Sequence, residues 1–348
     1  MKKIVIERPG GYGRLQIKKC ARPAPQPQEV LVEVSAAGIN FADMFIRLGL
    51  YKSAKEFVGW PITPGFEFAG RVMKCGADVT DLKAGDPVFG LTRFGAYATH
   101  VCAPRHQVFP ISGRSKFTSD QWAAFPTVFL TAYYGLFQSF VLRPGMTILV
   151  HSAAGGVGGA LLQLGKIADC RMTGVVGATH KIDTALNDGA DHVIDKSRED
   201  LWGRAREIAP GGFDAVFDGN GPATLKQSYR HLAPTGKLVA YGFHSMLSTH
   251  GGVANYLKLI WQYFRVPRLS PLNMTQENKS LIAFNLSFLF YRADLLAESM
   301  QDLLRWVEDG KIKAPTLQSF SFEKVADAHR ALESGTTVGK LILKFNDR

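Results

Sequence analysis

The sequence predicts an α/β protein in which a β-rich region precedes a doubly wound parallel sheet that helices cover on both faces. One observation is the stretch 147–159, where an apolar run, a glycine-rich turn and an amphipathic segment follow one another. A second is the alternation of apolar runs and helical patterns as far as residue 241. A third is the β pattern of residues 1–110. Such alternation calls for a parallel sheet between two helical layers.

Short strands joined by turns account for residues 1–110. Pro23, Pro25 and Pro27 punctuate the early apolar runs, and 30–34 has the clearest strand pattern. A short helix is expected to end near Leu48. The expected strands are 4–6, 15–18, 29–36 and 96–103, with two more that follow turns inside 64–72 and 83–90.

From residue 119 onward the pattern changes to helices and then to alternating strands and helices. Ser119 and Asp120 are expected to cap a helix that contains Trp122. The run 341–343 is expected to return as a strand to the β-rich region. The expected strands are 147–151, 171–176, 192–195, 213–218, 237–241 and 281–287, and the expected helices are 127–140, 157–168, 181–188, 198–209, 222–232, 294–309 and 325–332.

The glycine-rich turn at 152–158 has the chemistry of a dinucleotide site. Without a Cβ atom, Gly155 and Gly158 let the backbone approach a pyrophosphate and let the helix lie close to the strand. The unpaired N–H groups at the helix N-terminus then face the phosphates. The alternative is a flexible glycine loop, but a strand directly before the turn and a helix directly after it favour the nucleotide site.

Length and charge limit the function classes. The chain has 348 residues, enough for two domains, and a formal net charge of +11. Because Lys and Arg are scattered, the charge indicates a solvated basic surface that also suits a polyanionic cofactor, and no nucleic acid partner is expected. The cysteines form no CxxC pair and suggest neither a zinc site nor a disulfide framework. With no bilayer-length apolar run and no signal-peptide pattern, a cytoplasmic protein is expected.

Motifs along nearly the whole chain match one known family. They are GINFADMFIRLGLY at 38–51, PGFEFAG at 64–70, LKAGDPVFG at 82–90, ILVHSAAGGVGG at 148–159, GADHVID at 189–195 and FEKVADAHRALESGTTVGKLIL at 322–343. With them, the chain resembles the medium-chain dehydrogenase/reductase superfamily, in its zinc-independent quinone oxidoreductase (zeta-crystallin-like) branch. The start at 8–13 and the FEKVADA motif are most similar to vesicle amine transport protein homologues.

The resemblance implies two domains with the site in the cleft between them. A GroES-like catalytic domain is formed by both chain ends, 1–126 and 291–348. A Rossmann NADP-binding domain occupies 127–290. This division agrees with the hydrophobic pattern, in which a β-rich region is followed by alternating strands and helices and then by a strand that returns to the β-rich region.

Departures from the zinc-dependent members bear on the mechanism. Those members carry cysteine at the position of Asn40, histidine at that of Phe66, and a cysteine-rich lobe that this chain lacks. Without thiolate and imidazole ligands no metal site is expected, and Glu67 is expected to be structural. Alcohol dehydrogenation is then disfavoured. Hydride addition to a quinone or an α,β-unsaturated carbonyl depends less on stabilisation by a metal ion, because delocalisation spreads the negative charge that develops.

The expected cofactor is NADPH. An NAD site usually places an acidic residue about 20 residues past the glycines, but 176–181 reads VGATHK. The resemblance assigns Lys181 to the adenosine 2′-phosphate, with Lys196 as a second cation; the alternative for Lys181 is an exposed residue in the first turn of a helix. The expected cofactor contacts are Thr127, Ser152, Ala154, Gly155, Gly156, Val157, Gly158, Thr179, His180, Lys181, Lys196, Asn220, Tyr241, Gly242, Phe243 and Lys340.

Three residues, Asn40, Tyr51 and Thr131, are the candidates for catalysis. The resemblance places Asn40 and Tyr51 near the nicotinamide, where either donates a hydrogen bond to the acceptor oxygen. The alternative for Tyr51 is an aromatic lid over the cofactor. Thr127 and Thr131 begin a helix from which a hydroxyl can reach the nicotinamide amide. The alternative for Thr131 is a hydroxyl bonded to its own helix backbone.

The segment 251–291 is rich in aromatic residues, among them Trp261, Phe264 and Phe284. Its simplest role is to line the substrate cleft and to form a homodimer contact through an edge strand at 281–287. Docking on a membrane, helped by basic residues at 258–268, is the alternative. The function expected is NADPH-dependent, zinc-free hydride transfer to a quinone or an α,β-unsaturated carbonyl. The competing functions are an enoyl-thioester reductase and an NADPH-binding protein that associates with a membrane or a partner and has little turnover.

Overall fold

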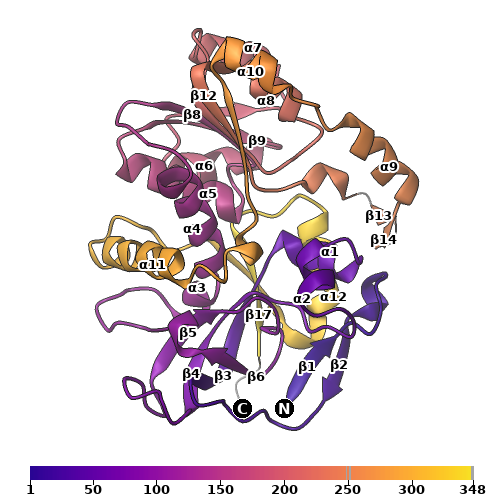
Figure 1. The fold of residues 1–348 in the computed structure, drawn as a ribbon, viewed down its shortest axis with the longest axis vertical. Helices are drawn as coiled ribbons and strands as arrows, with labels where there is room; N and C mark the ends of the chain where they lie inside the picture. The colour runs from indigo at the N-terminus through magenta and orange to yellow at the C-terminus, as the bar shows by residue number, and fades with distance from the viewer. Residues whose placement is uncertain (248, 251, 346–348) are drawn as a thin grey trace.

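Two large β-sheets organise the computed structural model, which describes residues 1–247, 249–250 and 252–345 (Figure 1). One sheet, in the lower half of Figure 1, is built from both ends of the chain, and the other, in the upper half, from the residues between them. The GroES-like and Rossmann halves implied by the resemblance are therefore both present.

The first sheet joins the N-terminal region to the end of the described chain. Within the described residues it has seven strands in the order β16-β17-β3-β4-β5-β7, with β6 also paired to β3. Because Leu343 lies opposite Ala37 in an antiparallel pair, the predicted return of the run 341–343 is confirmed. The strands are β3 (Glu29–Ile39), β4 (Glu67–Cys75), β5 (Pro87–Leu91), β6 (His100–Pro104), β7 (Val108–Pro110), β16 (Leu317–Ser321) and β17 (Lys340–Lys344).

Short elements surround this sheet. The predicted cap at Ser119 and Asp120 is wrong, because Thr118 precedes the helix and its hydroxyl accepts a hydrogen bond from the Gln121 N–H at 3.3 Å. Gln121 Oε1 in turn accepts a hydrogen bond from the Thr118 N–H at 2.8 Å, which completes a capping box. These elements are β1 (Lys2–Val5), β2 (Gln16–Lys19), α1 (Phe41–Arg47), α2 (Lys52–Phe57), α3 (Ser119–Ala123) and α12 (Val325–Glu333).

The second sheet has six parallel strands within the described residues, in the order β10-β9-β8-β11-β12-β15. Ile148 and Val150 of β8 pack on one side with α4 (Pro126–Tyr133) and α5 (Gly156–Ile167), whereas Leu149 packs on the other side with α7 (Leu201–Ile208) and α8 (Leu225–Arg230). This burial on both faces confirms the doubly wound arrangement. The strands are β8 (Thr147–His151), β9 (Arg171–Val176), β10 (His192–Asp195), β11 (Phe213–Asp218), β12 (Leu232–Ala240) and β15 (Ser280–Ala283).

The helices of this half differ from the predicted ones mainly at their ends. The predicted helix 127–140 is α4 followed by a π-helical turn, Tyr134–Gln138. Two helices, α9 and α10, were not predicted. The helices are α4 (Pro126–Tyr133), α5 (Gly156–Ile167), α6 (Ile182–Asn187), α7 (Leu201–Ile208), α8 (Leu225–Arg230), α9 (Tyr256–Arg265), α10 (Pro271–Glu277) and α11 (Ala293–Glu308).

The predicted strand 281–287 is wrong in its second half. β15 ends at Ala283 and a 3-10 turn, Leu286–Phe288, follows. The Asn285 side chain caps this turn by accepting a hydrogen bond from the Ser287 N–H at 3.0 Å, which takes the backbone out of the sheet. β15 is still the edge strand, as predicted. Across residues 1–247, 249–250 and 252–345, no helix has the length and apolar character needed to cross a membrane.

Candidate functional site

The glycine-rich turn connects β8 to α5 and leaves no room for larger side chains. A Cβ atom on Gly158 would lie 2.3 Å from the Ser152 carbonyl oxygen, and one on Gly156 would lie 2.9 Å from Val128 Cγ1 of α4. Gly155 precedes the first residue of α5, so the first N–H groups of this helix, which have no partner within it, lie beside the turn. The turn thus has the compact form that a phosphate-binding strand–turn–helix unit requires.

A cavity of about 480 Å³, which we call the glycine-loop cavity, opens beside this turn. It is lined by the ends of β8, β9, β11 and β12 and, from the end of the chain, by residues 335–341. Gly339 donates its N–H to the Ala154 carbonyl oxygen at 2.8 Å, which fixes the last of these segments against the turn. The expected cofactor residues that line it are Ser152, Ala154, Gly155, Gly156, Val157, Gly158, Lys181, Lys196, Asn220, Tyr241 and Lys340.

Two cationic side chains, those of Lys181 and Lys196, line this cavity. Lys181 donates from Nζ to the Gly335 carbonyl oxygen at 2.5 Å. Burial and, to a smaller extent, the neighbouring charge of Lys196 lower the pKa of Lys181. Thr179 and His180 do not line the cavity, because Thr179 donates to Asp195 at 2.7 Å and His180 lies 3.1 Å from the Thr336 carbonyl oxygen. Their contact with a cofactor stays a prediction.

A second cavity of about 470 Å³, which we call the apolar cavity, adjoins the first. The two cavities share Asn40, Phe41, Val157, Tyr241 and His244 in their walls. Most of the remaining lining is apolar or aromatic. The expected site residues in this cavity are Asn40, Tyr51, Thr127, Thr131, Tyr241, Gly242 and Phe243.

Asn40 belongs to a buried polar cluster on the wall that both cavities share. Its Nδ2 donates to Glu67 Oε1 at 2.9 Å, and its Oδ1 accepts from Lys340 Nζ at 2.5 Å. Lys340 and Glu67 are themselves 2.7 Å apart, and both are buried. The Thr127 N–H donates to Glu67 Oε2 at 2.8 Å. The cluster fixes the orientation of the Asn40 amide, and the structural role of Glu67 stays a prediction.

Tyr51 reaches across the apolar cavity to the second half of the molecule. Its hydroxyl donates to Asn285 Oδ1 at 2.9 Å, and burial raises the pKa of Tyr51. Phe66 and Phe94 both pack edge-on against the ring, which fixes its position. The Thr131 hydroxyl donates to the Thr127 carbonyl oxygen at 2.7 Å. This is the bond to its own helix backbone that the alternative interpretation of Thr131 predicts.

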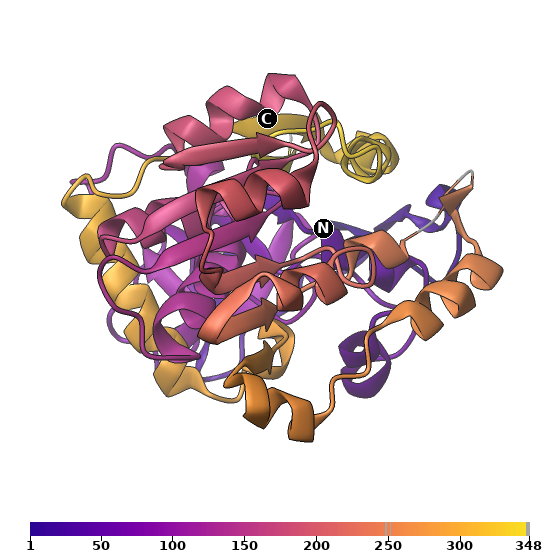
Figure 2. The same cartoon turned by 90° about the horizontal axis from the view of Figure 1, so that it is seen from above.

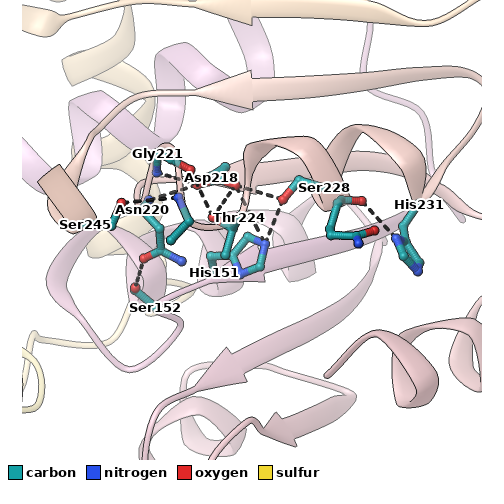
Figure 3. A network of polar contacts seen from close by, with 11 residues as sticks. His151, Ser152, Asp218, Asn220, Gly221, Thr224, Ser228, His231 and Ser245 are labelled. Carbon is teal, nitrogen blue, oxygen red and sulfur yellow. Dashed lines mark hydrogen bonds and ion pairs between the residues drawn. The ribbon is translucent and has the colours of Figure 1, made fainter. Parts of the chain in front are cut away.

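Asp218, at the end of β11, organises the opposite wall (Figure 3). One carboxylate oxygen accepts the Asn220 and Gly221 N–H groups at 2.9 and 3.0 Å. The other accepts the Thr224 and Ser228 hydroxyls at 2.7 and 2.8 Å. Asn220, held in this way, accepts from the Ser152 hydroxyl at 3.0 Å, which links the end of β11 to the glycine-rich turn.

His151 lies below this network and is fully buried. Its Nε2 is 3.0 Å from the Ser228 hydroxyl. Because that hydroxyl donates its hydrogen to Asp218, the imidazole must be the donor in the first contact. Burial lowers the pKa of His151, which favours the neutral ring, and Figure 3 shows the imidazole beside Ser228 and Thr224.

Sequence reasoning missed His244, which lines both cavities. It follows Tyr241, Gly242 and Phe243 directly, so the rule that selected those residues at a strand end could have found it. Its ring lies 4.1 Å from that of Phe41, and burial lowers the pKa of His244 to about 4. The segment 335–341 was missed as well, apart from Lys340, because no local pattern relates it to the turn at 152–158.

Two family models match the chain. The alcohol dehydrogenase GroES-like domain matches residues 26–113, and the zinc-binding dehydrogenase model matches residues 189–343. The second name refers to zinc, but within the part of the chain that the structure describes no group of three or more His, Cys, Asp or Glu side chains could hold a metal ion.

Similar proteins span the whole chain. The synaptic vesicle membrane protein VAT-1 homolog of Rattus norvegicus is 34% identical over 98% of this chain and 83% of its own length. The Escherichia coli quinone oxidoreductase complexed with NADPH is 29% identical, with a TM-score of 0.85 over 99% of this chain and 100% of that one. The CurK enoyl reductase is 25% identical, with a TM-score of 0.83 over 99% of each chain. The chain therefore belongs to the family of the VAT-1 homologues, within the zinc-independent quinone oxidoreductase-like branch of the medium-chain dehydrogenase/reductases.

Proposed function

We propose that the protein is an NADPH-dependent reductase that transfers a hydride to a quinone or an α,β-unsaturated carbonyl compound. The proposal rests on one observation. The glycine-loop cavity and the apolar cavity adjoin, and Asn40, Tyr241 and His244 lie in the wall of both. A dinucleotide along the first cavity would end where an apolar acceptor enters the second. The likeness to a quinone oxidoreductase complexed with NADPH supports the same assignment.

The residues of the glycine-loop cavity fit such a cofactor. The N-terminal N–H groups of α5 suit the pyrophosphate. The cationic side chains of Lys181 and Lys196 suit the adenosine 2′-phosphate. When bound, NADPH supplies the hydride. Apolar side chains around the wall that the two cavities share exclude water from the hydride transfer.

On the acceptor side, Asn40 and Tyr51 are the proposed hydrogen-bond donors. Asn40 Nδ2 donates one hydrogen to Glu67, which leaves its second hydrogen for a ligand oxygen. The Tyr51 hydroxyl would have to exchange Asn285 for the ligand. Either bond stabilises negative charge that develops on the acceptor oxygen.

The first experiment measures NADPH consumption with a panel of ortho- and para-quinones, together with a fluorescence titration of NADPH. Turnover with quinones is expected. Tight NADPH binding without turnover would count against these acceptors and favour the alternatives below. Absence of NADPH binding would contradict the proposal as a whole.

An enoyl-thioester reductase is the second candidate. Phe41, Phe284 and Phe290 give the apolar cavity a wall suited to an acyl chain, and the CurK enoyl reductase is a structural neighbour. NADPH oxidation with enoyl thioesters of increasing chain length separates the two candidates. A third candidate, an NADPH-binding protein with little turnover, would bind NADPH and reduce neither class.

We further propose that the protein works as a cytoplasmic homodimer. β15 lies at one edge of the parallel sheet and leaves one row of backbone groups available for a second copy. Sedimentation of the purified protein tests the dimer. A monomer at all concentrations would contradict it.

Replacing Lys181 with alanine is expected to weaken NADPH binding by about 1–3 kcal/mol, because a charge-assisted bond to the 2′-phosphate is lost. NADH binding is expected to stay nearly the same, since NADH lacks that phosphate. Fluorescence titrations with both cofactors measure the difference. Lys116→Ala, an exposed lysine outside both cavities, is the control. Equal losses for NADPH and NADH would remove Lys181 from the phosphate site.

Replacing Tyr51 with phenylalanine is expected to lower kcat/KM for a quinone by up to about tenfold, the value of one hydrogen bond. NADPH affinity is expected to stay unchanged. A Tyr51→Phe enzyme with full kcat/KM, beside an impaired Tyr51→Ala enzyme, would instead assign the ring to the lid role. Steady-state kinetics on the three proteins decide between the two.

A further inference from the structure

The wall of the apolar cavity is charged at one place. Among the described residues that line this cavity, Lys52 is the only one with a charged side chain at neutral pH. His244, the other basic residue there, is neutral because burial lowers its pKa to about 4. Tyr51 and Tyr241 keep their protons, because burial raises the pKa of both hydroxyls. A single positive charge therefore distinguishes the part of the wall at Lys52 from the rest.

Lys52 stands at the opening of the apolar cavity. It is the first residue of α2 and is exposed to solvent, although it also lines the cavity. Figure 1 and Figure 2 show α2 on the same side of the molecule as α1 and α9, whose residues Phe45 and Leu259 line the cavity too. A lysine in such a place lays its methylene groups along apolar surface and keeps its ammonium group in water. The ammonium group is thus available to a ligand that enters from solvent.

A second cation lies next to the cavity wall. The Arg93 Nε donates to the Ser287 carbonyl oxygen at 3.2 Å, and its guanidinium is 5.7 Å from the centre of the Phe290 ring. Both Ser287 and Phe290 line the apolar cavity. Within the described residues neither Lys52 nor Arg93 forms an ion pair, and Glu56, the one acidic residue of α2, forms none either. This side of the cavity therefore has positive charge that no carboxylate of the described chain neutralises.

The charge of Lys52 lies apart from the wall where we propose that the hydride is transferred. Lys52 lines the apolar cavity alone, whereas Asn40 lines both cavities. An anionic group at Lys52 would therefore not compete with the cofactor phosphates at Lys181 and Lys196. The cavity of about 470 Å³ is in the size range of sites for small organic ligands, so it can hold the body of an acceptor between Lys52 and Asn40.

We propose that the acceptor is an apolar quinone or α,β-unsaturated carbonyl compound that carries a carboxylate, and that Lys52 binds this carboxylate at the opening of the cavity. The inference rests on the proposed reductase function, because it assigns a substrate class to the same site. The apolar walls suit the body of the acceptor, and the ammonium group forms a charge-assisted hydrogen bond with the carboxylate. Since Lys52 is exposed, water and salt screen this pair, so the expected gain is several-fold rather than of many orders of magnitude.

The test compares acceptors that have the same shape and differ in charge. 1,4-Naphthoquinones with a 2-carboxyethyl or a 2-carbamoylethyl side chain meet this condition, because two methylene groups separate the ring from the charge. In the wild type, kcat/KM for the carboxylate is expected to be about five- to tenfold higher than for the amide. This ratio is expected to fall when NaCl is raised from about 0.1 M to about 0.5 M, because the pair is exposed.

Variants of α2 show whether the preference comes from Lys52. Lys52→Met is expected to remove it and to leave kcat/KM for the amide nearly unchanged. Lys52→Glu is expected to reverse it, so that the amide becomes the better acceptor, because like charges repel. Lys55→Met is the control, since Lys55 is an exposed lysine of the same helix that does not line the cavity. Lys52→Met and Lys55→Met change the net charge of the protein equally, so a difference between them reports the position of the charge.

Calorimetry with the matching naphthalenes, which cannot be reduced, measures the same preference without turnover. Equal dissociation constants for the carboxylate and the amide in the wild type, or a preference that survives in Lys52→Met, would overturn the proposal. No turnover of either quinone, together with tighter binding of the carboxylate, would contradict the reductase function and leave the carboxylate site standing. A Lys52→Met effect seen with an enoyl-coenzyme A thioester, but not with an N-acetylcysteamine thioester or the carboxylate quinone, would also overturn the proposal, because Lys52 would then bind the phosphates of a carrier.

Discussion

Replacing Lys340 with methionine is expected to lower the free energy of unfolding by about 3–5 kcal/mol, as found when one partner of a buried ion pair is removed. Lys340 is buried and its ammonium group contacts Glu67, the Ile39 carbonyl oxygen and Asn40. Methionine fills a similar volume but leaves the Glu67 carboxylate without its counter-charge. Urea unfolding followed by circular dichroism measures the loss.

Two further variants show whether the loss comes from the unpaired carboxylate. The double variant Lys340→Met/Glu67→Gln is expected to recover most of the lost free energy, because the remaining buried group is neutral. Lys166→Met breaks the exposed pair with Asp191 and is expected to cost less than about 1 kcal/mol. A double variant as unstable as Lys340→Met alone would show that the cost comes from lost packing.

Replacing Asp218 with alanine is expected to cost about 2–4 kcal/mol of unfolding free energy, because the two backbone N–H groups and two hydroxyls lose their shared acceptor in a buried site. The affinity for NADPH is expected to fall about tenfold as well. The reason is that Asp218 holds the Asn220 turn against Ser152 in the wall of the glycine-loop cavity. Urea unfolding and the NADPH fluorescence titration measure the two effects.

Asp218→Asn is the matched control for this prediction. Its amide oxygen still accepts the two backbone N–H groups, and the Thr224 and Ser228 hydroxyls can rotate to accept from the amide nitrogen. Both losses are therefore expected to be smaller than in Asp218→Ala. Unchanged NADPH affinity in Asp218→Ala would contradict the positioning of Asn220 by this carboxylate.

Local patterns identified the unit that carries the proposed cofactor site. The strand, turn and helix at 147–159 were predictable because hydrophobic period and glycine placement act over a few residues. The parallel sheet was predictable for the same reason, because each strand and helix of the alternation has its own local pattern. Burial of β8 on both faces agrees with that prediction. The helix at 256–265 was not predicted, although its apolar residues recur at helical spacing, because the aromatic content of 251–291 was interpreted as cleft lining and as an edge strand. Which side of this helix faces solvent was not predictable, since a sequence pattern carries no information on which side the protein covers.

The sequence by itself determined the fold family, the glycine turn and the strand that returns at 341–343. The tertiary structure alone decided which distant residues complete the site. Lys340 contacts Asn40 across 300 positions of sequence, Gly339 bonds to Ala154, and Tyr51 meets Asn285 across the cavity. Such contacts depend on how the two sheets are set against each other, and this arrangement is fixed by packing of the whole molecule rather than by any local periodicity.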